Sequence, residues 1–192
     1  MTALIVGLLL FLGLHSTRFI ADGARSRFVE QRGLKTWRAL YSVVSGVGFV
    51  LIIWGYSLTL RQPVVLYEPA PWARTLAGVL TLAAIVLITA SFVPRNHFRV
   101  WVGHPLVLGT ALWALAHLQA TRTLADLLLF GAFLAWAIVC FASLRARDKV
   151  AGVQRKPAEA LQSAIALVIG VAAWAGFTFS LHARLIGIAP YG

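Results

Sequence analysis

Two of the five histidines, His15 and His117, lie within strongly apolar stretches and have the clearest potential for chemistry in this sequence. His15 follows the apolar run 4–14, and His117 lies near the end of the run 106–118. A membrane interior offers no water to hydrate an imidazole, so ionisable side chains at that depth are rare and usually functional. These two histidines are therefore the first candidates for a functional site.

The other three histidines carry weaker signals. His97 lies in the polar connection 94–98 and is predicted to be a loop residue. His104 precedes Pro105, and because proline is favoured in the first turn of a helix, this pair predicts a helix start at an interface. His182 ends the last apolar stretch of the chain.

The chain has few side chains for carboxylate or thiol chemistry, with six Asp and Glu residues and one cysteine. Asp126 follows Thr123 by three residues, a spacing typical of an N-terminal helix cap. Cys140 is the single cysteine, so no intrachain disulfide can form. Phosphate-binding glycine loops, helical zinc motifs and nucleophile elbows are absent from the sequence. The other five carboxylates fall in predicted loops, as solvated or salt-bridged surface: Asp22, Glu30, Glu68, Asp148 and Glu159.

Composition indicates an integral membrane protein. The chain of 192 residues is 60% hydrophobic and 12% charged, whereas soluble domains carry about 25% charged residues. Its net charge of +11 does not indicate nucleic-acid binding, because the basic residues are gathered in short segments between long apolar ones. That distribution is typical of segments that orient membrane helices.

Six apolar stretches approach the roughly 20 residues needed to cross a bilayer. We predict an all-α polytopic membrane bundle of about six transmembrane helices, and we interpret residues 1–192 as one domain. The fourth stretch is the shortest, and residues 98–103 are predicted either to extend it or to form an interfacial lead-in. The six predicted spans are 3–20, 37–58, 72–93, 105–120, 124–144 and 161–181.

The basic residues predict the orientation of these helices. The first, third and fifth connections with their flanks hold 13 of the 17 Lys and Arg residues. Because basic connections face the cytoplasm in most membrane proteins, both termini are predicted to lie on the non-cytoplasmic side. The chain is then a multi-pass protein in the lipid bilayer.

Helix length predicts the depth of the two buried histidines. If the first helix continues to about Arg25 and the fourth begins at Pro105, His15 lies about ten residues from the cytoplasmic end and His117 about twelve. At about 1.5 Å per residue, the two depths differ by roughly 3 Å. A start of the fourth helix at Phe98 would separate the two levels.

Two imidazoles at one depth suit the axial positions of a haem iron. Non-haem metals are less favoured, because they usually need three or four protein ligands. The alternative that the residues leave open is structural, with each histidine hydrogen-bonded to a neighbouring helix.

Five stretches form a combined pattern that is more specific than any one of them: 12–16 (LGLHS), 104–109 (HPLVLG), 112–118 (LWALAHL), 127–136 (LLLFGAFLAW) and 182–187 (HARLIG). Together they resemble the NnrU family of bacterial inner-membrane proteins, and the likeness covers nearly the whole chain. The family is named for its association with denitrification and nitric oxide metabolism. It is similar to the plant and cyanobacterial 15-cis-zeta-carotene isomerase, a membrane enzyme with a bis-histidine haem b.

The resemblance implies a haem b protein in which His15 and His117 are the iron ligands. His15 matches the ligand that precedes a serine in the isomerase, and His117 matches the ligand that follows a histidine–proline pair, here His104 and Pro105. His104 is accordingly included among the predicted cofactor-binding residues. A redox-dependent, isomerase-like activity on a small apolar substrate, or a response to nitric oxide, is implied in the same way. The isomerase cysteine that can replace the second histidine is Ala114 here, so a histidine-to-cysteine ligand switch is not carried over.

Two other functions stay open. The pair His104 and Pro105 also resembles a motif of the isoprenylcysteine carboxyl methyltransferases, which bind S-adenosylmethionine in the membrane. In this chain Gly103 and Val107 replace the arginine and tyrosine of that motif, and the paired glutamates are missing, since Glu159 stands alone. The third hypothesis is a non-enzymatic assembly factor for denitrification enzymes. The sequence indicates neither the organic substrate nor the oligomeric state.

Overall fold

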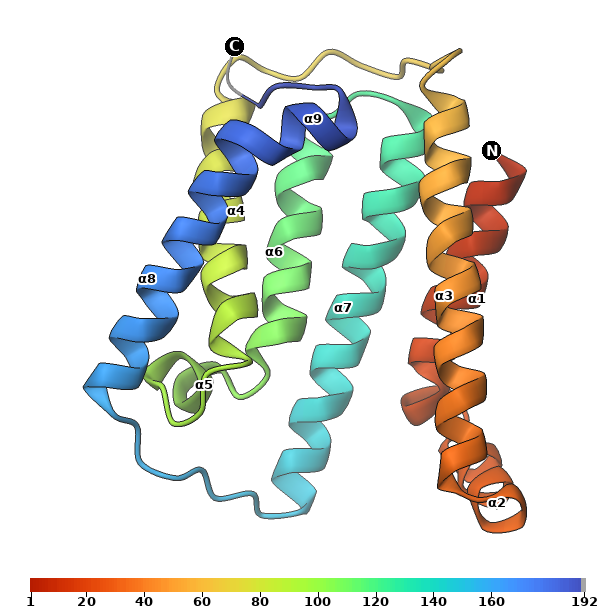
Figure 1. Cartoon of the computed structure of the whole chain (residues 1–192), viewed down its shortest axis with the longest axis vertical. Coiled ribbons are helices and arrows are strands. Elements are labelled where there is room, and N and C mark those ends of the chain that lie inside the picture. The colour runs from red at the N-terminus through yellow and green to blue at the C-terminus, as the bar shows by residue number, and fades with distance from the viewer. Residues whose placement is uncertain (191–192) are drawn as a thin grey trace. The chain divides into compact units, whose positions relative to one another are not determined.

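Helices make up the regular structure of residues 1–190, the part of the chain that the computed structural model describes (Figure 1). Contacts divide it into two compact units. Unit 1 comprises Met1–Tyr67 and Arg122–Ala132, and unit 2 comprises Glu68–Thr121 and the residues from Phe133 onward. The helices are α1 Thr2–Ile20, α2 Asp22–Arg32, α3 Leu34–Thr59, α4 Ala73–Ala90, α5 His97–Val102, α6 Pro105–Ala120, α7 Leu124–Val150, α8 Ala160–Gly176, the π-helix η1 Phe177–Leu181 and α9 His182–Ile186.

Five helical segments are long and apolar enough to cross a membrane: α1, α3, α4, α7, and the continuous run Ala160–Ile186. The remaining predicted span, the fourth at 105–120, is α6, a shorter apolar helix of 16 residues. The prediction of a polytopic helical membrane protein is confirmed. Many large apolar side chains on these helices are exposed, as lipid-facing residues must be.

Glycines allow α1 and α3 of unit 1 to pack closely. A Cβ added to Gly7 would lie 2.7 Å from the backbone nitrogen of Ile52, and one added to Gly48 would lie 2.9 Å from the backbone nitrogen of Phe11. Small residues at such positions are a common basis of helix association in membranes. This contact holds the α1 backbone around Phe11 directly against α3.

A buried polar cluster joins the end of α3 to the start of α7, also within unit 1. Asp126, 5% exposed, accepts hydrogen bonds from the backbone nitrogen and hydroxyl of Thr123 at 2.9 and 2.6 Å, and from the Tyr56 hydroxyl at 2.6 Å. The Thr123 hydroxyl accepts in return from the Asp126 backbone nitrogen. The predicted helix cap at Asp126 is therefore confirmed, and Tyr56 is a partner that the spacing did not reveal.

In unit 2, α4 packs against both α6 and α8. Close approach again depends on glycine, since a Cβ on Gly109 would lie 2.7 Å from the Ala84 carbonyl oxygen and one on Gly170 would lie 2.8 Å from Val86 Cα. The turn that leads into α5 is fixed by Asn96, which is fully buried. Its side-chain nitrogen donates to two carbonyls of the preceding segment, and its oxygen accepts from the Arg99 nitrogen at 2.8 Å.

One expectation about helix length is wrong. α1 ends at Ile20, like the predicted span 3–20, and does not continue to about Arg25, the condition used for the depth of His15; Ala21 leaves helical geometry with φ −137° and ψ 41°. A separate polar helix, α2, follows with none of its residues buried. The fourth span begins at Pro105, as predicted, and the lead-in before it is the short helix α5, which ends at Val102.

Candidate functional site

His15 lies on α1, half-buried, among aromatic side chains of unit 1. Its Nδ1 lies 2.7 Å from the carbonyl oxygen of Phe11, one turn earlier in the helix. The Phe11 ring stacks on the imidazole at a centroid distance of 4.2 Å, and the Tyr41 ring of α3 lies 5.1 Å away. The ring is therefore held by one backbone acceptor and by aromatic contacts from two helices.

His117 has the same local arrangement on α6, in unit 2. Its Nδ1 lies 2.8 Å from the carbonyl oxygen of Trp113, again one turn earlier. The Trp113 ring lies 5.2 Å from the imidazole and makes an edge contact with Phe133 at 5.5 Å. Each of the two predicted ligands thus has an aromatic residue four positions before it.

These matching hydrogen bonds determine the tautomer of both rings. A carbonyl oxygen only accepts, so Nδ1 carries the proton in the neutral imidazole and the lone pair lies on Nε2. Metal-bound histidines in proteins usually have this arrangement, in which the second ring nitrogen donates to a fixed acceptor. His15 and His117 therefore have the donor chemistry of axial haem ligands.

The depth estimate for this pair has to be corrected. Since α1 ends at Ile20, His15 lies five residues from that end, whereas His117 lies twelve residues from Pro105 at the start of α6. The corresponding rises are about 7.5 and 18 Å. Equal depth no longer follows from helix length, and the two histidines belong to different units.

His182 is the histidine that unit 2 brings to His117. Their ring centroids lie 6.5 Å apart with the planes inclined by 20°. The Nδ1 of His182 lies 2.7 Å from the carbonyl oxygen of Ile188, which again places the lone pair on Nε2. Phe177 contacts the His182 ring edge-on at 5.7 Å. No spacing rule predicts that His182 approaches His117, because the contact joins distant parts of the chain.

The π-helix η1 immediately precedes His182. Such segments are rare and frequently occur at functional sites. Phe177, the first residue of η1, is one of the residues whose rings contact His182. The apolar composition of this segment correctly predicted a membrane-spanning helix. It did not predict the change from α-helical to π-helical winding.

His104 lies in an ionic cluster at the start of α6. Its Nε2 is 3.0 Å from Asp148 Oδ2, and Arg155 pairs with the same carboxylate oxygen. The Phe141 ring contacts the imidazole edge-on at 6.3 Å. Because Asp148 accepts, Nε2 of His104 is the donor in this pair. The cofactor-binding role predicted for His104 would thus leave Nδ1 as its available ring nitrogen.

His97 differs from its predicted loop position, since it is the first residue of α5. Its backbone nitrogen and Nδ1 both lie within hydrogen-bond distance of the Ser163 hydroxyl, at 2.9 and 2.7 Å. Beside it, Arg95 pairs with Glu159 at 2.6 Å. The salt-bridged role predicted for Glu159 and Asp148 is confirmed, but Asp148 lies in α7 and not in a loop, as Asp22 and Glu30 lie in α2. In residues 1–190, no three His, Cys, Asp or Glu side chains come together as a metal site.

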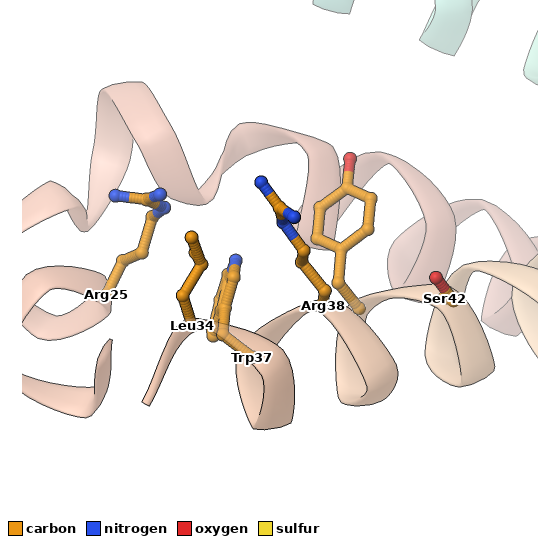
Figure 2. Close-up of a pocket in the computed structure, with 6 residues that line it drawn as sticks. Arg25, Leu34, Trp37, Arg38 and Ser42 are labelled. Carbon is orange, nitrogen blue, oxygen red and sulfur yellow. The ribbon is translucent and has the colours of Figure 1, made fainter. Parts of the chain in front are cut away.

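A cavity of about 470 Å³, wide open on one side, lies in unit 1 between α2 and α3, and Tyr41 is among its lining residues. Figure 2 shows the guanidinium groups of Arg25 and Arg38 on either side of Leu34 and Trp37. The Arg25 guanidinium carbon lies 5.9 Å from the centre of the Trp37 ring, within the range of a cation–π contact. From the sequence alone, both arginines were predicted only to orient the membrane helices.

Apolar helices of spanning length, histidines within them and basic connecting segments define a multi-pass helical membrane protein. A family model described as "NnrU protein" matches residues 3–190, nearly the whole chain. The chain therefore belongs to the NnrU family. No curated protein and no solved structure matches it.

Proposed function

We propose that this protein binds haem b in the bacterial inner membrane through His15 and His117, and that it serves nitric oxide metabolism linked to denitrification. The observation that carries the proposal is the matching state of the two imidazoles. Each sits in an apolar helix and donates Nδ1–H to the carbonyl four residues earlier, so that Nε2 has the lone pair. Membership of the NnrU family supports the physiological context.

The residues fit the group in their chemistry. Two neutral histidines are known axial ligands of haem iron, and the surrounding aromatic rings offer the apolar environment that a porphyrin requires. Bound haem would supply one-electron chemistry, and a diatomic gas would reach the iron only by displacing one of the two histidines. The protein's own contribution is to fix both imidazole tautomers through Phe11 and Trp113 and to keep the site apolar.

The visible spectrum of protein purified in mild detergent from haem-replete cells tests the proposal. We expect a Soret band with sharp α and β bands after reduction. His15→Ala and His117→Ala should each convert the low-spin spectrum to a high-spin one or abolish it, and added imidazole should restore it. His97→Ala is the matched control, because its ring contacts Ser163 and neither candidate ligand. A colourless wild-type preparation would refute the proposal.

Nitric oxide distinguishes a gas-responsive haem from one that only transfers electrons. We expect the gas to shift the Soret band of the reduced protein, since an axial histidine must dissociate to admit it. Ala114, fully buried in α6, has no side-chain donor that could replace a dissociated histidine. A reduced spectrum that is unchanged by nitric oxide would refute the gas-responsive role and leave haem binding intact.

A further inference from the structure

The cavity between α2 and α3 has the composition of a site for an acidic group. Arg25 and Arg38 place two guanidinium groups on one opening (Figure 2). Arg38 makes no ion pair within residues 1–190, and Arg25 has only Asp22, at 3.9 Å on the exposed side of α2. Guanidinium groups bind carboxylates and phosphates through paired hydrogen bonds. Two guanidiniums of this kind match a ligand with two acidic oxygens or two acidic arms.

The walls of the cavity indicate that the rest of the ligand is apolar and flat. Trp37 and Tyr41 line it, and their rings lie 6.2 Å apart. Tyr41 in turn lies 5.1 Å from the ring of His15. A series of aromatic rings therefore runs from Arg25 over Trp37 and Tyr41 to His15, the candidate iron ligand.

The positions of Arg38 and Tyr41 on α3 suit one ligand that reaches both the arginines and His15. Arg38 precedes Tyr41 by three residues, a rise of about 4.5 Å, which is less than one helical turn. The long arginine side chain extends this reach further. A planar group bound at His15 can thus direct its acidic edge toward Arg38 while its body lies against aromatic rings.

We propose that the cavity binds the two propionate carboxylates of the haem held by His15. This inference rests on the proposed function, since it assigns the acidic edge of the same cofactor. Arginines that only orient α1 and α3 in the membrane would need neither a cavity nor an aromatic path to His15. The shared chemistry is that of an anion, so the alternative source is the phosphate of an anionic phospholipid.

The test compares haem b with its dimethyl ester, which lacks both carboxylates. Apo-protein in nanodiscs of phosphatidylcholine is titrated with each compound, and the Soret band gives the dissociation constants. We expect wild type to prefer haem b by about tenfold, from two part-exposed charge-assisted interactions. The preference should disappear in Arg25→Gln/Arg38→Gln and be partly retained in Arg25→Lys/Arg38→Lys, with unchanged spin state.

Arg27→Gln/Arg32→Gln is the matched control, because it removes the same charge from α2 at exposed positions outside the cavity. It should keep the wild-type preference for haem b. Equal affinities of wild type for haem b and its ester would overturn the inference while sustaining haem binding, whereas no uptake of either compound would overturn the proposed function itself.

Nanodiscs that contain phosphatidylglycerol distinguish the lipid alternative. If the cavity binds propionates, anionic lipid should leave the preference for haem b unchanged. The propionate assignment would be overturned, and a phospholipid site identified, by two results together. Wild type would lose its preference for haem b in phosphatidylglycerol, and the Arg25→Gln/Arg38→Gln protein would not respond to that lipid.

Discussion

The contact between α1 and α3 predicts opposite effects for one substitution at two neighbouring glycines. A Cβ at Gly48 would lie 2.9 Å from the Phe11 nitrogen, 3.1 Å from Phe11 Cβ and 3.2 Å from the Gly7 carbonyl oxygen. A Cβ at Gly46 would have no neighbouring atom within 4 Å. All the crowding atoms at Gly48 belong to the packed backbone or to the first side-chain carbon, so none can move cheaply.

The magnitude follows from two opposing contributions. Overpacking of a close contact costs about 1–3 kcal/mol, whereas replacing glycine by alanine inside a helix gains up to about 1 kcal/mol. Gly48→Ala should therefore lower the free energy of unfolding by about 1–2 kcal/mol. Gly46→Ala should leave it unchanged or raise it by less than 1 kcal/mol.

Unfolding by SDS titration, followed by tryptophan fluorescence in mixed micelles, measures both variants against wild type. The site should respond as well, because Phe11, which carries the crowded nitrogen, also provides the carbonyl that holds His15. In haem-loaded protein we expect Gly48→Leu to disturb the spectrum and Gly46→Leu to leave it intact. The reasoning is refuted if Gly48→Ala is as stable as Gly46→Ala or more so.

Three further predictions concern polar contacts. Tyr56→Phe should lower the free energy of unfolding by about 1.5 kcal/mol, since it removes a hydrogen bond to the buried Asp126 carboxylate; the same SDS titration measures it. His104→Ala should cost less than 1 kcal/mol, because its ion pair with Asp148 is partly exposed; the SDS titration measures this cost as well. His182→Phe should alter the reduced haem spectrum if the His117 ring is a ligand; an unaltered spectrum contradicts this.

Composition and local motifs were sufficient to predict the membrane helices. The start of α6 was predicted because proline at position 105 has a preference for the first helical turn, and the cap of α7 was predicted from the three-residue spacing of Thr123 and Asp126. Both signals arise from hydrogen bonds between residues that are close in sequence. The orientation of the termini stays a prediction.

The missed features depend on contacts between distant residues or on local geometry that hydropathy does not report. The break at Ala21 separates the apolar helix α1 from the polar helix α2. The change of composition at this point is compatible with a break or with one continuous helix, so composition alone does not predict the break. The pairing of His182 with His117 and of Tyr56 with Asp126 joins residues from separate helices. Such pairs have no spacing rule that a single sequence would reveal.

The π-helix η1 gives this span a place where one residue can be lost without a change of register. A π-turn accommodates one residue more than an α-helical turn, so deletion of one residue between Phe177 and Leu181 would restore ordinary winding. Because the wide turn absorbs the additional residue, the segment that follows would keep its orientation relative to α8, and His182 would stay on the face that approaches His117. The same deletion before His117 in α6, an uninterrupted α-helix, would rotate the residues that follow by about 100°. The approach of these two rings thus tolerates the loss of one residue from η1 and not from α6.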